Sequence, residues 1–205
     1  MSKENPKYRG IYVDESGNPI PGAKEFIDWK SRSLASSIII LAETGQDGYV
    51  FLNTKRGPNC PDNIGKLVFT CGYLNWDETV AEGACREVYE ETGLQLTPSD
   101  LMVAGWNDLP SENRQNLTFR WVALMDFEKL NELIQTGALN TDTASRGGEP
   151  GECDEIKLMA YSEIKGHDDL FAFGHAGLAQ MVVENLEKIK KLQPLIRPLI
   201  KSLGV

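Results

Sequence analysis

Three glutamates at helical spacing constrain this chain more than any other feature. Glu87, Glu90 and Glu91 stand at positions i, i+3 and i+4, so in a helix their carboxylates meet on one face. Apolar residues recur every four positions on the opposite face, which predicts a helix over residues 79–91 that is fixed to a core. The members of this apolar stripe are Val80, Ala84 and Val88.

Three carboxylates brought onto one face repel one another, so the pattern needs a compensating charge. A hard cation between them would provide it, because Mg²⁺ prefers carboxylate and water oxygens. A solvated acidic helix face without metal is the alternative reading of the spacing alone. We also expect Arg86 to offset part of the repulsion through Glu82 and Glu90, each four residues away. Gly72 and Gly93 bracket the segment as a loop–helix–loop unit.

Residues 72–94, GYLNWDETVAEGACREVYEETGL, resemble the Nudix box, G-x5-E-x7-R-E-U-x-E-E-x-G-U, in which U is a bulky aliphatic residue. Every specified position agrees: Gly72, Glu78, Arg86, Glu87, Val88, Glu90, Glu91, Gly93 and Leu94. The resemblance implies an α/β fold, a Nudix-type α/β/α sandwich around a mixed β-sheet. It further implies a Mg²⁺-dependent hydrolase, with Mn²⁺ as a substitute, whose metal ligands are Glu87, Glu90 and Glu91.

A second stretch extends the resemblance. Residues 152–156, ECDEI, match the E-x-x-E-(I/V) pattern that places a loop glutamate ahead of a strand in the same family. The general base in the family is either a box glutamate or this loop glutamate, so Glu87 and Glu152 are the candidates here, with Glu155 third. Arg86 completes the catalytic group with these two, although its expected part, like that of Glu78, is to position the helix. Residues 141–151 are polar and Gly-rich, which predicts a mobile loop that closes over substrate.

Candidate substrate-binding residues are less constrained by spacing. Three basic residues are candidates for the substrate phosphates, and each fits a solvated surface charge equally well: Arg56, Lys66 and Arg114. Four aromatic residues could stack on a base, although core or interface roles are commoner for such side chains: Trp29, Tyr73, Trp106 and Trp121. His167 and His175 show no ligand spacing and receive no role.

The resemblance leaves the substrate open. We favour a nucleoside diphosphate derivative of the ADP-ribose or nucleotide-sugar type. A nucleoside triphosphate pyrophosphatase and a non-catalytic Nudix-like ligand-sensing domain are the alternatives. A prenyl diphosphate isomerase of the same fold would need a catalytic thiol, and only Cys71 stands where it could supply one.

Charge and cysteine usage narrow the partners and the compartment. The 205 residues carry a net charge of −9, which disfavours nucleic acid and anionic membranes as partners. The four cysteines include no CxxC pair, the first residues contain no apolar run, and the longest apolar stretch is too short to cross a bilayer. We therefore expect a cytoplasmic protein with a small-molecule, nucleotide-like substrate.

Two units are predicted along the chain. Residues 1–33 form an N-terminal extension of strand and turn, and residues 34–205 form the hydrolase domain. The extension exceeds a minimal Nudix core, as in dimeric members of the family, so we expect a homodimer. Hydrophobic patterns predict strands over residues 8–13, 37–42, 49–54, 67–70, 117–126 and 156–161. They also predict helices over residues 127–135 and 177–191, the second interrupted afterwards by Pro194 and Pro198.

Overall fold

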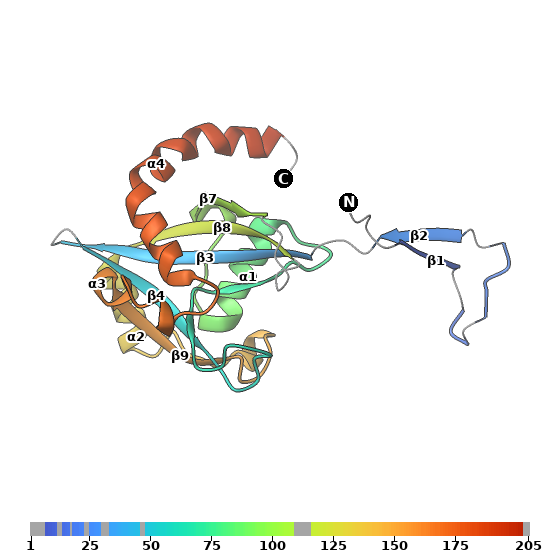
Figure 1. Ribbon diagram of the computed structural model, residues 1–205, viewed down its shortest axis with the longest axis horizontal. Coiled ribbons are helices and arrows are strands. Elements are labelled where there is room, and N and C mark those ends of the chain that lie inside the picture. Colours follow the sequence, from blue (N-terminus) through green and yellow to red (C-terminus); the bar gives the residue numbers. More distant parts are fainter. Residues whose placement is uncertain are drawn as a thin grey trace.

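The computed structural model describes residues 7–11, 14–16, 18–22, 25–29, 33–45, 48–108 and 116–202 (Figure 1). Its centre is a seven-stranded sheet with the order β5-β4-β3-β8-β7, to which β6 adds beside β3 and β9 beside β4. Only β3 and β8 run parallel among these pairs, so the sheet is mixed, as predicted. The strands are β3 (Ser33–Thr44), β4 (Gly48–Arg56), β5 (Leu67–Val68), β6 (Cys71–Tyr73), β7 (Leu101–Asn107), β8 (Asn116–Met125) and β9 (Cys153–Ala160).

The middle of β3 is buried on both faces because helices cover the sheet from either side. Ile38 and Ile40 point into one hydrophobic cluster, and Ile39 and Leu41 point into the other. This alternation follows from the period of two along a strand. A continuous apolar run in the sequence therefore marks a central strand with two cores.

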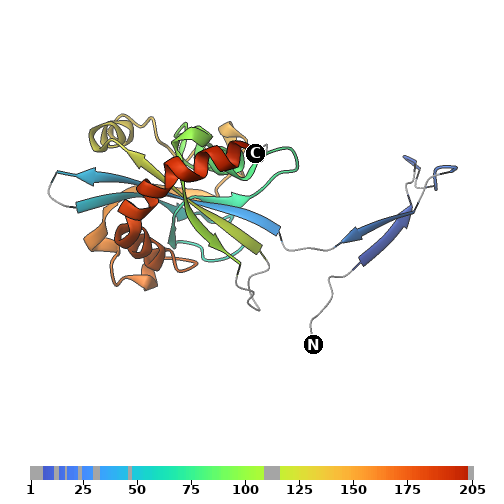
Figure 2. The same ribbon diagram turned by 90° about the horizontal axis from the view of Figure 1, so that it is seen from above.

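Helices α1 (Val80–Thr92) and α2 (Phe127–Gln135) pack on one face of the sheet, through Ala84, Val88 and Leu130. The short α3 (Tyr161–Ile164) and the long α4 (His175–Ser202) contribute to the core on the other face. The result is the predicted α/β/α sandwich (Figures 1 and 2). Short 3₁₀ turns lie at η1 (Pro98–Asp100), η2 (Ala144–Arg146) and η3 (Asp168–Leu170).

Helix α4 departs from the prediction. Pro194 and Pro198 were expected to interrupt it, yet it runs to Ser202. A proline removes one backbone donor and crowds the preceding turn, which can bend a helix without ending it. Figure 1 shows α4 strongly curved along its length.

The N-terminal segment forms a sheet of its own. Strands β1 (Lys7–Ile11) and β2 (Glu25–Trp29) pair antiparallel, and within the described residues neither pairs with the main sheet (Figure 2). The predicted strand over residues 8–13 corresponds to β1, whereas β2 and β7 had not been predicted. Across the described ranges, no helix is both long and apolar enough to span a membrane.

Candidate active site

The helix that carries the acidic residues is fixed at both ends. Thr79 caps its N-terminus by accepting from the Glu82 amide, and the Glu82 carboxylate accepts from the Thr79 amide at 2.8 Å. Gly93 ends it in the left-handed conformation, with φ near 80°. The expected Glu82–Arg86 pair is therefore wrong, because the Glu82 carboxylate closes the capping box instead.

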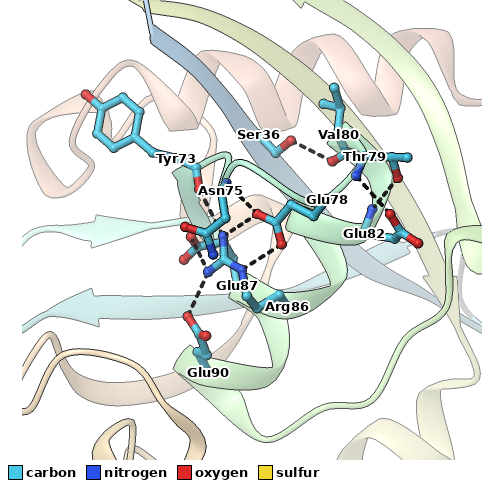
Figure 3. Close-up of polar contacts among 10 residues, drawn as sticks. All are labelled: Ser36, Tyr73, Asn75, Glu78, Thr79, Val80, Glu82, Arg86, Glu87 and Glu90. Atoms are coloured by element: carbon cyan, nitrogen blue, oxygen red, sulfur yellow. Dashed lines mark hydrogen bonds and ion pairs between the residues drawn. The ribbon is translucent and has the colours of Figure 1, made fainter. Parts of the chain in front are cut away.

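Arg86 is the centre of the polar network shown in Figure 3. Its guanidinium donates to both Glu78 oxygens at 2.8 and 2.9 Å, and to the Tyr73 carbonyl at 2.9 Å. It also donates to Glu87 Oε1 at 2.8 Å and Glu90 Oε2 at 2.9 Å. The hydrogen bond to Glu78, followed by the pull of the other carboxylates, raises the pKa of Arg86. Arg86 thus ties the preceding loop to α1 and holds two of the three acidic side chains.

Two of the predicted metal ligands are buried carboxylates. Glu87 is 9% exposed and Glu91 is 5% exposed. Burial raises the pKa of Glu87 to about 7 and that of Glu91 to about 8. For Glu91, repulsion by Glu87 and Glu152 adds to the rise in pKa, while hydrogen bonds from Thr54 Oγ1 and the Cys71 amide oppose it.

In this conformation the carboxylates of Glu87, Glu90 and Glu91 do not converge on a single metal position. Within the ranges that the structure describes, no group of three His, Cys, Asp or Glu residues is arranged to hold a metal ion. Glu87 and Glu90 face Arg86, and Glu91 faces Thr54. The chemistry of the set nevertheless fits a hard divalent cation. All the donors are carboxylate oxygens, and for Glu87 and Glu91 burial and repulsion by neighbouring carboxylates raise the pKa, so a positive charge is needed to compensate their charged forms.

Gly72 lies directly against the Glu87 carboxyl group. A Cβ atom at position 72 would be 2.0 Å from the Glu87 carboxyl carbon, so no larger residue fits without displacing that side chain. The close approach therefore requires a glycine at this position of the motif, since the neighbouring atoms are the carboxyl group of a predicted metal ligand.

The loop glutamate Glu152 lines the same cavity as Glu87 and Glu90, whereas Glu91 is buried behind that lining. Its carbonyl accepts from the Gly57 amide at 2.7 Å and from the Cys60 thiol at 3.2 Å, which fixes the main chain there. Burial is the largest cause of the raised pKa of its half-buried carboxyl group. Glu155, by contrast, is exposed on β9 and does not line the cavity. Of the two loop candidates, the structure brings only Glu152 to the site.

The segment before Glu152 is already joined to α1 in this conformation. Arg146 Nε donates to the Glu90 carbonyl at 3.2 Å, and Thr143 Oγ1 donates to the Glu149 carbonyl at 2.6 Å. Gly148 lies against Glu90 as well. Glu152 therefore lines the cavity without further closure, and movement of the loop remains a prediction.

The cavity has a volume of about 580 Å³ and an acidic end formed by Glu87, Glu90 and Glu152. Arg56 lines it and is held by Asp62, with Nη2 to Oδ1 at 2.9 Å. Its guanidinium carbon lies 5.1 Å from the centre of the Phe173 ring. This places Arg56 where a substrate phosphate could reach it.

Other expected binding residues lie elsewhere. Lys66 is not among the residues that line the cavity, and its ammonium donates to the Asp169 carbonyl. Arg114 lies outside the described residues, as does the side chain of Trp29. Trp121 belongs to the core, whereas Tyr73 is exposed at the edge of the cavity and Trp106 is exposed outside its lining.

The structure adds lining residues that the sequence did not indicate. They come from β3, from β8, from the start of α4 and from the segment just before it, and include Ser37, Thr118, Arg120, Phe173 and His175. His175 Nδ1 accepts from the Phe69 amide at 2.9 Å, which fixes its ring against the sheet. Phe173 has a positive φ of 58°, which is uncommon for a non-glycine residue. A single sequence contains no periodic signal that would gather these residues, because they lie on elements far apart in the chain and meet only in the folded structure.

Comparison with known proteins gives a consistent family. A model described as NUDIX domain matches residues 31–181. A search of curated proteins finds no match. Among solved structures, a MutT/nudix family protein from Enterococcus faecalis superposes with a TM-score of 0.60 at 15% identity, covering 80% of this chain and 66% of that chain.

Two further solved structures contain ligands. The NUDIX domain of Shewanella oneidensis NrtR, complexed with ADP ribose, gives a TM-score of 0.57 at 17% identity and covers 77% of this chain and 90% of that one. A bifunctional NMN adenylyltransferase/ADP ribose pyrophosphatase from Francisella tularensis, complexed with AMP and a Mn ion, gives 0.54 at 17% identity, covering 76% and 42%. At these identities the structural likeness establishes the fold alone.

Proposed function

From the premise that this chain belongs to the NUDIX domain family and is a Nudix hydrolase, we propose that it cleaves a diphosphate linkage in a nucleoside diphosphate derivative. The favoured substrates are ADP-ribose and nucleotide sugars, and the favoured metal is Mg²⁺. The observation that carries the proposal is the junction of Glu87, Glu90 and Glu152 with Arg56 in one cavity of about 580 Å³. That volume lies in the range of sites for nucleotide-sized ligands.

The acidic residues of α1 have the chemistry to bind a divalent cation, with Glu87, Glu90 and Glu91 as the ligands. When bound, such an ion neutralises phosphate charge and lowers the pKa of water. Arg86 keeps Glu87 and Glu90 in place through its hydrogen bonds. Arg56 would bind a substrate phosphate, because its guanidinium is a donor-only group suited to that acceptor.

Glu152 is the preferred general base, with Glu87 second. A base must stand within hydrogen-bond reach of the attacking water and need not bind metal. Glu152 comes from a different element than the metal ligands, lines the cavity, and has a raised pKa because it is half-buried. A carboxyl group whose pKa lies closer to neutrality accepts a proton more readily than an ordinary glutamate.

Two proteins that share the fold support the leaning towards ADP-ribose: one was solved in complex with ADP ribose and the other is an ADP ribose pyrophosphatase. A screen of ADP-ribose, nucleotide sugars and nucleoside triphosphates with Mg²⁺ or Mn²⁺ tests it, with the products separated by chromatography and identified by mass spectrometry. We expect AMP and ribose 5-phosphate from ADP-ribose. Fastest turnover of a triphosphate would favour the pyrophosphatase alternative, and tight ligand binding with no product would favour the ligand-sensing alternative.

We also propose a homodimer that uses the N-terminal extension. The motivating observation is that β1 and β2 form a hairpin sheet with no strand partner in the main sheet among the described residues. Light scattering of the full chain and of a variant lacking the extension tests this. A full chain with the mass of a monomer would overturn the dimer.

A further inference from the structure

Ser37 leaves a buried polar atom unused in the floor of the cavity. It is 2% exposed, and its hydroxyl has no hydrogen-bond partner among the residues that the structure describes. It also lines the cavity. A buried hydroxyl without a partner lowers stability, so its presence calls for an explanation.

The position of Ser37 in the sheet shows what the floor is made of. Ile39 and Leu41, on the same face of β3, belong to the core beneath α4. At Ser37 this face changes from apolar to polar. Its partner in register on β8 is Arg120, and Thr118 lies two residues before Arg120; both line the cavity.

The floor lies beside the acidic end. Ser37 pairs with Cys71 on β6, and the next residue, Gly72, lies against the Glu87 carboxyl group on the opposite face of the strand. One cavity is lined by Ser37 and by the carboxylates of the acidic end, so a substrate whose diphosphate occupies that end would extend its organic part towards Ser37. A serine hydroxyl both donates and accepts, as the hydroxyl and carbonyl groups of a sugar or nucleoside require, whereas a phosphate oxygen only accepts.

We infer that Ser37 is a specificity-determining residue whose hydroxyl binds an oxygen of the organic group carried by the diphosphate. This inference rests on the proposed function of the site. The group is the nucleoside or the terminal sugar, and the shared chemistry is a neutral hydroxyl or carbonyl oxygen. The hydroxyl is left unpaired in the free protein because the ligand supplies its partner.

The test compares Ser37→Ala with Ser36→Ala. The two serines are adjacent on β3, similarly buried, and both line the cavity. The Ser36 hydroxyl, however, already donates its proton to the Val80 carbonyl at 3.0 Å on the α1 side, so that proton is not free for a ligand. Without ligand, we expect Ser37→Ala to raise the melting temperature or leave it unchanged and Ser36→Ala to lower it. In activity assays, Ser37→Ala should raise KM for ADP-ribose about 3–10-fold, the loss of one neutral hydrogen bond, with kcat nearly unchanged. Ser36→Ala should leave KM within about twofold of that of the wild type.

Competitive inhibitors locate the contact. Methylenediphosphonate carries nothing beyond its phosphates, so its inhibition constant should not change in Ser37→Ala. AMP and ribose 5-phosphate represent the two halves of ADP-ribose, and the half that loses affinity identifies the group over Ser37. If the screen selects a substrate other than ADP-ribose, the two phosphomonoesters formed by cleaving that substrate replace AMP and ribose 5-phosphate as inhibitors.

Three results overturn the inference. An unchanged KM in Ser37→Ala would show that the hydroxyl does not bind substrate. An equal loss of affinity for methylenediphosphonate would assign Ser37 to the phosphates instead. A wild-type protein that cleaves no compound in the screen would overturn the proposed function and this inference together, whereas the first two results would leave the proposed function intact.

Discussion

The acidic end and the floor of the cavity differ in whether their buried polar groups have partners within the protein. At the acidic end, the carboxylates of Glu87 and Glu90 pair with Arg86. On the floor, the hydroxyl of Ser37 has no partner within the described part of the chain. The contrast follows from the energies involved, because an unpaired buried charge costs far more than an unpaired hydroxyl. A buried charged group needs a partner within the protein before any ligand binds. A buried neutral hydroxyl can remain unpaired until a ligand binds, because the cost is smaller.

Removal of divalent metal is expected to have the largest effect on the acidic end. The internal network holds the carboxylates but provides no ion to neutralise substrate phosphates, so turnover should fall to the uncatalysed background in EDTA. Excess Mg²⁺ or Mn²⁺ should restore it. Product formation from the substrate that the screen selects, measured by chromatography before and after metal addition, checks this. Full turnover in chelator would contradict the assignment of Glu87, Glu90 and Glu91 as ligands.

The second prediction separates the two loop glutamates. Glu152→Gln keeps the shape of the side chain but removes its basicity, so kcat should fall by about 10²–10⁴-fold with little change in substrate Kd. Glu155→Gln is the matched control, because Glu155 is exposed on β9 outside the cavity lining and should keep nearly full activity. If only KM rises in Glu152→Gln, Glu152 binds substrate and Glu87 becomes the preferred base.

The acidic end could be predicted from the sequence far better than the floor. Glu87, Glu90 and Glu91 lie within five residues, so helical periodicity alone places them on one face. Glu152 lies far away in sequence and was placed by resemblance, which left Glu155 open until the fold separated them. The strands over residues 37–42 and 49–54 and the helix over 127–135 could also be predicted, because their signals are local.

The floor could not be predicted because its members meet through the sheet register. Ser37 and Arg120 become neighbours only when β3 and β8 pair in parallel, and a single sequence does not specify that alignment.

The wrong prediction for Glu82 has a different and local cause. Glu82 has the spacing to pair with Arg86, but the unsatisfied amide at the start of α1 binds its carboxylate instead.

A third prediction tests whether activity depends on the position of the Glu87 carboxylate. Gly72→Ala places a methyl group 2.0 Å from the present Glu87 carboxyl carbon, so that carboxylate must move. Displacement of a functional group by about 1 Å can cost about 100-fold in activity, and we expect kcat/KM to fall by roughly that factor. Gly177→Ala is the control, since an added Cβ there meets nothing within 4 Å and alanine suits a helix. Equal activities of the two variants would show that the Glu87 position is not critical.

The smallest expected effect concerns stability without metal, and it tests whether the network fully compensates the buried charges. Glu91 is almost completely buried and has only the Thr54 hydroxyl and the Cys71 amide as hydrogen-bond donors, with no cation paired to it. Glu90 is less buried and pairs with Arg86. Because the pKa of Glu91 is raised to about 8, folding near pH 7 requires this carboxyl group either to take up a proton or to hold a poorly compensated charge, and both cost stability. Glu91→Gln removes that cost and should stabilise the metal-free protein near neutral pH by about 1 kcal/mol, a rise in Tm of about 2–4 °C. Glu90→Gln removes one partner of an ion pair and should leave Tm unchanged or lower it.

Differential scanning calorimetry in EDTA measures the Tm of both variants, and addition of Mg²⁺ should stabilise the wild type more than Glu91→Gln. A Glu91→Gln variant less stable than the wild type in EDTA would mean that the hydrogen bonds from Thr54 and Cys71 outweigh desolvation of the charge, and that even the most buried carboxylate is compensated before metal binds.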